Sequence, residues 1–207
     1  MPPIDPHILE QVEAELERRG LLLLHDRALP SITTLVAGAP IAGSWWAHPK
    51  GNEIYQVVEE LERGARAVAL KLVNGKVTFV HRRLWPLLLA ATGGESSARP
   101  SSAVRELLSL LETGNTLHVA ELRRSGTRAP VELKRAVEEI ERRLLAFVTS
   151  EHTEGGKHEK VLQRWSDWAR GHEVEAAPVT PESARAELET IAVALSTSGT
   201  RVRLAWT

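Results

Sequence analysis

One stretch of the sequence, from Asn115 to Trp168, constrains the fold more than any other. Thr116 is suited to cap a helix, and Pro130 stands where a second helix would begin, because the amide hydrogen that proline lacks has no partner there. Apolar residues of this second helix recur close to the helical period: Val131, Leu133, Val137, Ile140 and Leu144. The β-favouring runs 145–150 and 160–162 then flank a glycine turn. Helix, turn, helix and hairpin in this order predict a winged helix, in which the second helix usually lies in a DNA groove.

The first half of the chain shows the same order of elements. The predicted helices and a short buried strand follow one another over residues 5–19, 21–24, 30–35 and 54–63. Two further strands, Ala67–Val73 and Lys76–Val80, are joined by Asn74-Gly75. Asn-Gly between such runs is a strong hairpin signal, because both turn residues tolerate a positive φ. A closing helix is expected over residues 84–91.

These patterns predict an α+β fold, a tandem winged-helix protein that is rich in helices and has small antiparallel hairpins. We expect the first winged-helix unit over residues 1–92 and the second over residues 103–171. The segment 93–102, rich in glycine and serine, is the predicted linker. Residues 172–207 are predicted to form a C-terminal helix and a strand that docks back on one of the hairpins, since a strand needs a sheet to join.

Charge and composition limit the classes of protein to which this chain can belong. The 207 residues contain 26 Lys and Arg against 27 Asp and Glu, so any affinity for nucleic acid must come from the distribution of charge. Cysteine is absent, which excludes disulfides and thiolate metal sites. The longest apolar runs are too short to span a bilayer and the first residues lack the pattern of a signal peptide, so a cytoplasmic protein without a membrane partner is expected.

A first candidate surface is the predicted hairpin of the first unit. Between Gly64 and Arg83 there are five bases, no acid and one histidine: Arg66, Lys71, Lys76, His81, Arg82 and Arg83. Such a surface attracts phosphates and releases counterions. The alternative is a solvated edge that uses lysine to discourage pairing between strands of different molecules.

A second candidate surface surrounds the turn before the second helix of the second unit. The bases there are Arg123, Arg124, Arg128, Lys134 and Arg135. Helix-turn-helix proteins present side chains to base edges and phosphates at this place. Because these bases crowd one end of the helix, DNA binding is favoured over an ordinary polar helix face.

The predicted wing contains His152, Lys157 and His158 around its glycine turn. These residues are expected to contact DNA or to be solvated. Two histidines could form a metal pair, but the spacing suggests no third ligand. No metal site and no cofactor are therefore predicted, and no nucleotide or zinc-protease motif occurs in the chain.

The loop around Trp45 and Trp46 admits two interpretations. Adjacent tryptophans usually plug a core between helices. Alternatively, one of them stacks on a base while His48, Lys50 and Asn52 contact phosphates or base edges. A catalytic version of this hypothesis joins four residues into an acid–base or amine-nucleophile set, as an abasic-site lyase needs: Trp46, His48, Lys76 and His81.

The second unit also resembles a known family. The run Ala120-Glu-Leu-Arg-Arg, the wing from His152 to His158 and the pair Trp165-x-x-Trp168 are similar to the winged-helix modules of bacterial crosslink-repair DNA glycosylases of the AlkZ/YcaQ type. The similar part covers about a quarter of the chain. That family is built from tandem winged helices, so the resemblance implies binding of duplex DNA in repair. Its catalytic Gln-x-Gln or Gln-x-Asp pair does not occur in this sequence, so no glycosylase role is carried over to any residue.

The sequence therefore predicts a DNA-binding tandem winged-helix protein, with intact or damaged duplex DNA as its partner and a role in repair as an expectation. One alternative is an enzyme that processes DNA lesions, a glycosylase or an abasic-site lyase. Another is a protein-interaction module, because tandem winged helices also serve as assembly platforms and the net charge is not basic. The pattern predicts no oligomeric state.

Overall fold

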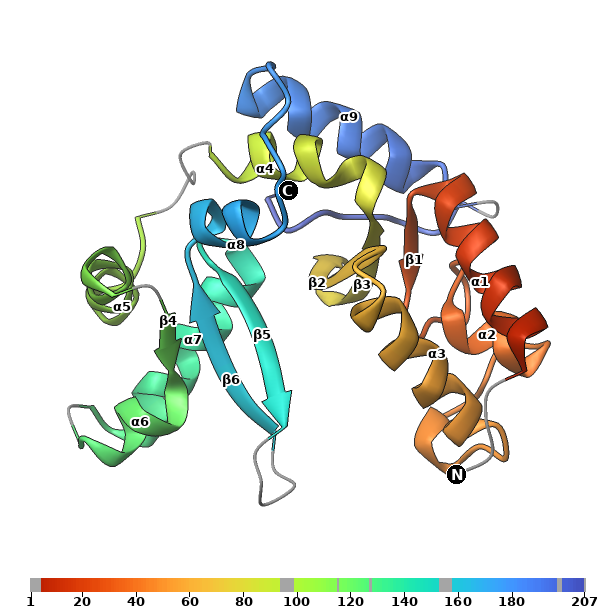
Figure 1. The fold of residues 1–207 in the computed structure, drawn as a ribbon, viewed down its shortest axis with the longest axis horizontal. Coiled ribbons are helices and arrows are strands. Elements are labelled where there is room, and N and C mark those ends of the chain that lie inside the picture. Colours follow the sequence, from red (N-terminus) through yellow and green to blue (C-terminus); the bar gives the residue numbers. More distant parts are fainter. Residues whose placement is uncertain are drawn as a thin grey trace.

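The computed structural model describes residues 5–93, 99–114, 116–126, 128–152, 158–196 and 199–206, with the backbone alone described at 151, 152 and 158. Helices surround two small antiparallel sheets, one in each half of the chain (Figure 1). The predicted α+β class is confirmed. Within these ranges no helix combines the length and the apolar character needed to cross a membrane.

The first half folds around a three-stranded sheet in the order β1-β3-β2. Its elements are α1 (Pro6–Arg19), β1 (Leu21–Leu23), α2 (Ile32–Ala37), the short 3-10 helix η1 (Trp45–Ala47), α3 (Gly51–Arg63), β2 (Ala67–Val73) and β3 (Lys76–His81). The strands 21–24, 67–73 and 76–80 predicted from the sequence are thus confirmed to within a residue or two. The central strand β3 pairs with both neighbours antiparallel.

Local signals set the ends of these elements. The Asp5 side chain accepts a hydrogen bond from the amide of His7, and Gly20 ends α1 with a φ of 79°. A Cβ at Gly20 would also lie 2.6 Å from a methyl carbon of Leu84, so this position requires glycine for space as well as for backbone conformation. Asn74 and Gly75 join β2 to β3 with φ values of 52° and 67°, as expected for the hairpin turn.

The second half repeats the order of helix, strand, helix, helix, strand and strand. Its elements are α5 (Ser102–Thr113), β4 (Thr116–His118), α6 (Val119–Arg124), α7 (Pro130–Arg143), β5 (Phe147–His152) and β6 (His158–Gln163), and its sheet has the order β4-β6-β5. Both halves therefore contain the element order on which the winged-helix prediction rests. The predicted glycine turn at 154–156 lies outside the described residues.

Two local predictions in this half are wrong. Thr116 does not cap a helix: it begins β4 and pairs with Gln163, because β6 offers a ladder of backbone hydrogen bonds that a local helix cap cannot match. Val131 does not face the core and is 60% exposed. Leu133, Val137 and Ile140, spaced four and three residues apart, form the buried stripe of α7 instead.

Each half has its own apolar core, and a third core joins the halves. The joining core includes the helices η2 (Arg82–Leu84), α4 (Trp85–Thr92), α8 (Trp165–Gly171) and α9 (Pro181–Val193). Trp85 of α4 and Trp168 of α8 meet edge to face at its centre, with ring centroids 5.1 Å apart. Figure 1 shows α4 and α9 side by side at the top of the molecule, above both sheets. The predicted unit boundaries remain predictions, and so does the role of 93–102 as a linker.

The C-terminal segment docks on the first hairpin, as predicted, but it does not form the predicted strand. Leu204 makes one antiparallel bridge with Val73. The amide of Asn74 donates to the carbonyl of Arg203, and the amide of Arg203 donates to Asn74 Oδ1. The turn residue Asn74 therefore forms hydrogen bonds with the C-terminal segment through both its backbone and its side chain. The strand pairing is limited to the bridge between Leu204 and Val73.

Candidate nucleic-acid interface

The bases of the first hairpin lie against carboxylates from other elements. Lys71 Nζ lies 3.0 Å from Glu141 of α7, and Lys76 Nζ lies 2.6 Å from Asp26 in the loop between β1 and α2. Arg66 pairs with Glu13 of α1. The folded hairpin is therefore not the acid-free basic surface that was expected, and contacts of Lys71 and Lys76 with DNA stay predictions. The acids are distant in the sequence and reach the hairpin only in the folded chain.

The ion pair between Lys76 and Asp26 contributes to the stability of the fold, because the Asp26 carboxylate is buried. The Asp26 side chain also accepts hydrogen bonds from the amides of Ala28 and Leu29. Burial alone would raise the pKa of Asp26, but the hydrogen bonds from Lys76 and from the two amides outweigh it and hold the pKa below its usual value. Lys76 thus stabilises a buried carboxylate that would otherwise lack a cation.

Arg82 and Arg83 follow the hairpin and remain exposed. Arg83 Nε donates to the carbonyl of Glu17 at the C-terminal end of α1, a place that favours a cation. The guanidinium of Arg82 lies 5.7 Å from the ring centroid of Trp85. Both side chains therefore have contacts within the protein, and their contacts with DNA stay predictions.

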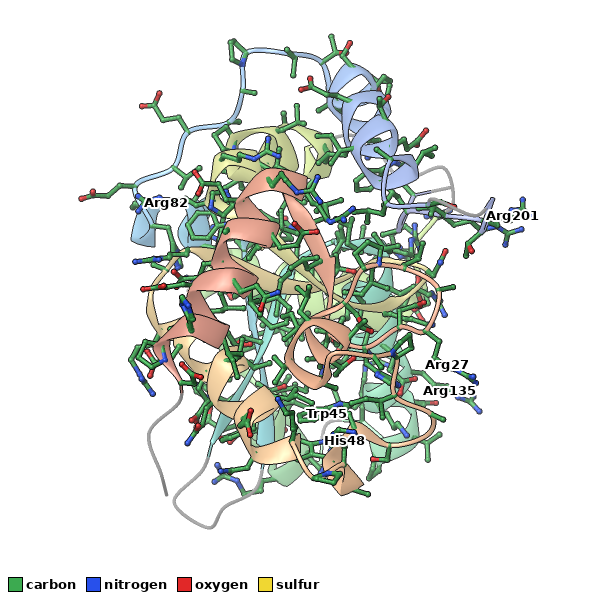
Figure 2. All side chains as sticks on the ribbon, turned by 90° about the vertical axis from the view of Figure 1, so that its right-hand side faces the viewer. Arg27, Trp45, His48, Arg82, Arg135 and Arg201 are labelled. Atoms are coloured by element: carbon green, nitrogen blue, oxygen red, sulfur yellow. The ribbon has the colours of Figure 1, made fainter. Side chains whose placement is uncertain are left out.

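The four candidate catalytic residues do not form one site. Lys76 and His81 stand at opposite ends of β3, so their Cα atoms are about 17 Å apart at about 3.4 Å per residue. His48 Nδ1 accepts from the amide of Lys50, and His81 Nδ1 accepts from the amide of Arg83. Burial lowers the pKa of His81. In Figure 2, His48 lies in the lower part of the view and Arg82, which follows β3 in the chain, at the upper left. The predicted acid–base set is wrong.

The loop and helix that carry Lys50 and Asn52 do not make a cationic surface. Lys50 Nζ donates to the carbonyl of Val36 and lies 3.6 Å from Glu53, while Asn52 is exposed in the first turn of α3. The rest of α3 carries further acids: Glu59, Glu60 and Glu62. A DNA groove would meet mostly negative charge on this helix.

The second unit has a different surface at the same place in its element order. Arg123 and Arg124 of α6 and Lys134 and Arg135 of α7 are all exposed; we call these four residues the α6–α7 surface. Arg124 lies 3.9 Å from Glu121 and Lys134 lies 3.8 Å from Glu138, both pairs being solvent-exposed. Among the described residues, Arg123 and Arg135 have no ion pair. Figure 2 shows Arg135 projecting outward from the edge of the molecule.

Arg128 was predicted to belong with these bases, but it holds the turn between α6 and α7. Its guanidinium pairs with Glu106 of α5 and lies 3.7 Å from Glu132. The hydrogen bond with Glu106 raises the pKa of Arg128. Arg128 is half-buried and therefore fixes the position of the α6–α7 surface without forming part of it.

The predicted wing contacts lie largely beyond the described side chains. His152 and His158 pair across β5 and β6, and Lys157 falls outside the described residues. Their contacts with DNA therefore stay predictions. In the part of the chain with described side chains, no group of three His, Asp or Glu residues is placed to hold a metal ion.

The tryptophan loop supplies an exposed aromatic surface. Trp46 is 62% exposed, so the interpretation of Trp46 as a core plug is wrong, whereas Trp45 packs partly against the first core. The rings of Trp45 and Trp46 stack with centroids 4.0 Å apart, and Tyr55 lies 5.6 Å from Trp46. Sequence reasoning missed Tyr55, although its spacing from Glu59 and Glu62 already places the three on one helix face.

Comparisons with known proteins do not assign a family. No protein-family model matches the chain, and no curated protein or solved structure matches it. The resemblance to crosslink-repair glycosylases therefore stays a prediction.

Proposed function

We propose that both halves are winged helices and that the chain binds duplex DNA through the α6–α7 surface of the second. The element order and the sheet orders β1-β3-β2 and β4-β6-β5 support this assignment. In such a fold the second helix of the helix-turn-helix enters the major groove and the hairpin contacts the backbone. In the second unit these elements are α7 and the hairpin of β5 and β6.

The observation that carries the proposal is the exposure of four cations at the start of this helix and on the helix before it. The pairs of Arg124 with Glu121 and of Lys134 with Glu138 are exposed and near the 4 Å limit of an ion pair. Pairs of this kind contribute about 0.3–0.5 kcal/mol. Phosphates, which release counterions when a cation binds them, can therefore displace these glutamates.

The first turn of α7 supports the same orientation. Pro130 begins the helix, and the N-terminal end of a helix favours a negative group such as a phosphate. Val131, which is 60% exposed, lies on this turn, three and four residues before Lys134 and Arg135. An apolar side chain at this place can contact a thymine methyl group in the major groove, which gives the exposed valine a role.

The experiment is a salt titration of duplex binding by the full chain. Wild type should bind a short duplex, and the slope of log affinity against log salt should reflect several phosphate contacts. Arg124→Glu with Lys134→Glu should weaken binding about tenfold or more and reduce the slope by about two. The matched control, Arg18→Glu with Arg63→Glu, makes the same charge change at two exposed arginines of α1 and α3.

Two results would overturn the proposal. Equal losses in the two double variants would mean that total charge, not the α6–α7 surface, governs binding. Absence of duplex affinity for wild type at about 50 mM salt, where non-specific binding is strong, would favour the protein-interaction alternative.

A further inference from the structure

The stack of Trp45 and Trp46 stands at one wall of a cleft between the two halves of the chain. On this wall lie the stacked rings and, from α3, Tyr55, Glu59 and Glu62. The opposite wall is β5, with Val148, Thr149 and Ser150. The cleft has a volume of about 410 Å³, within the range of about 300–1,000 Å³ of small-molecule sites.

The cleft also contains an ion network that bridges the halves. Glu141 of α7 accepts from Lys71 of β2 at 3.0 Å and from Lys160 of β6 at 2.7 Å. Glu59 accepts a hydrogen bond from the Tyr55 hydroxyl. The cleft therefore contains three carboxylates, of Glu59, Glu62 and Glu141, against two ammonium groups, and both ammonium groups are already paired.

These charges decide which part of a nucleic acid the cleft can receive. A phosphate would meet a net negative lining, so the backbone is disfavoured. A nucleobase is uncharged, and its π face can stack on an indole ring. The exocyclic amino group of cytosine can donate to a carboxylate, whereas thymine lacks such a group.

The cleft shares two elements with the unit that carries the α6–α7 surface, because Glu141 of α7 and the β5 residues 148–150 line it. In Figure 1, α6 lies at the lower left, the arrowhead of β5 near the lower middle and the orange segment before α3 at the lower right. β5 also packs on α7, so the second unit supplies one wall of the cleft. A duplex held by α6 and α7 would therefore be bound by the same unit that forms one wall of the cleft.

We propose that the cleft holds one unpaired nucleobase of a bound DNA, stacked on Trp46, with cytosine preferred over thymine. This inference rests on the proposed binding of duplex DNA and names the kind of DNA that the protein prefers. The α6–α7 surface holds the paired region, and the cleft distinguishes a duplex with an extruded base from a perfect duplex.

The test compares three oligonucleotides: a perfect duplex, the same duplex with a single bulged cytosine, and one with a single bulged thymine. Wild type should bind the cytosine bulge about 5- to 100-fold more tightly than the perfect duplex, as expected for one stacked base. The affinity for the thymine bulge should lie between the affinities for the cytosine bulge and the perfect duplex. Trp46→Ala should remove the preference but leave perfect-duplex affinity unchanged, and Trp46→Phe should keep part of it.

The control variant is Val193→Ala, which truncates an exposed apolar side chain on α9. It should leave all three affinities unchanged. Equal binding of bulged and perfect duplexes by wild type, or a preference that survives Trp46→Ala, would overturn this inference. The proposed function would stand in that case if Arg124→Glu with Lys134→Glu still weakened every complex. Absence of binding to any of the duplexes would overturn both.

Discussion

The two halves of the chain share one order of elements and differ in the surfaces that these elements present. α3 in the first half carries Glu53 and three further glutamates, and its flanking Lys50 is engaged within the protein. α7, at the same place in the second half, presents Lys134 and Arg135 to solvent. The same topology thus carries an acidic helix in one half and a basic helix end in the other.

The sequence and the structure differ in which of the two basic regions is free of neighbouring acids. The first hairpin and its flanks contain five bases and no acid between Gly64 and Arg83, yet Lys71 and Lys76 pair with Glu141 and Asp26. The bases near α6 and α7 are interspersed with acids in the sequence, yet they stay accessible. Surface charge therefore depends on where the fold brings the acids, and a count along the chain does not reveal it.

The largest expected effect tests whether the two halves are independent. Trp168 is 2% exposed and contacts Trp85 of α4 and Phe147 of β5, so Trp168→Ala should lower the free energy of unfolding by about 3–5 kcal/mol. Because the core is shared, urea unfolding should remain a single transition with coincident probes. Trp46→Ala, at an exposed site, should change stability by about 0.5 kcal/mol or less. Two separate transitions in wild type would show that the halves must be compared as independent domains.

A pair of lysine variants sharpens the comparison of the two surfaces. Lys76→Met leaves the buried carboxylate of Asp26 without its cation and should cost about 1–3 kcal/mol of stability, with duplex affinity unchanged. Lys134→Met should do the opposite: it should leave stability nearly unchanged and weaken duplex binding. Urea unfolding measures the stability of both variants, and a binding titration measures their duplex affinity. The comparison fails if both lysines affect binding equally.

The buried carboxylate of Asp26 also predicts how stability depends on pH. Since the pKa of Asp26 is lower in the folded than in the unfolded chain, its contribution to stability is present above the unfolded pKa of about 3.9 and is lost as the pH falls through the folded value. Glu15 acts in the same direction, because Arg18 holds its pKa at about 2. Asp26→Asn should therefore be less stable than wild type at pH 7 and lose less stability between about pH 5 and pH 2. If the free energies of unfolding of wild type and Asp26→Asn fell in parallel over this pH range, the stabilising role of the Asp26 carboxylate would be contradicted.

The smallest expected effect concerns the start of α7. Ala129 occupies the N-cap position with an extended backbone and provides no side-chain cap, whereas Ser31 caps α2 through the amide of Thr34. Ala129→Ser should add about 0.5–1 kcal/mol of stability and leave duplex affinity unchanged. Thermal unfolding and the binding titration test both parts. A loss of affinity would place the cap itself against DNA.

Much of the first half could be predicted because its signals are local. Asp5 and Gly20 bound α1, and Asn74-Gly75 sets the hairpin turn, since each residue acts on its own backbone or on neighbours within a few positions. The strand at Thr116 could not be predicted, because its partner Gln163 lies far along the chain. For the candidate site, the sequence identified the exposed bases of α6 and α7 but could not separate Arg128, whose partner Glu106 belongs to another helix.

The sequence by itself determined the class of the fold, most of the order of its elements and most of their ends, because periodicity, caps and turn residues act over a few positions. Only the tertiary structure decided which charges remain accessible, that Trp46 lies exposed beside a cleft, and that the C-terminal segment ends in a single bridge to Val73. These outcomes depend on which side chains meet across long stretches of chain. Whether a charge is paired or a ring is buried depends on contacts between residues that are distant in the sequence, and no short sequence pattern encodes such contacts.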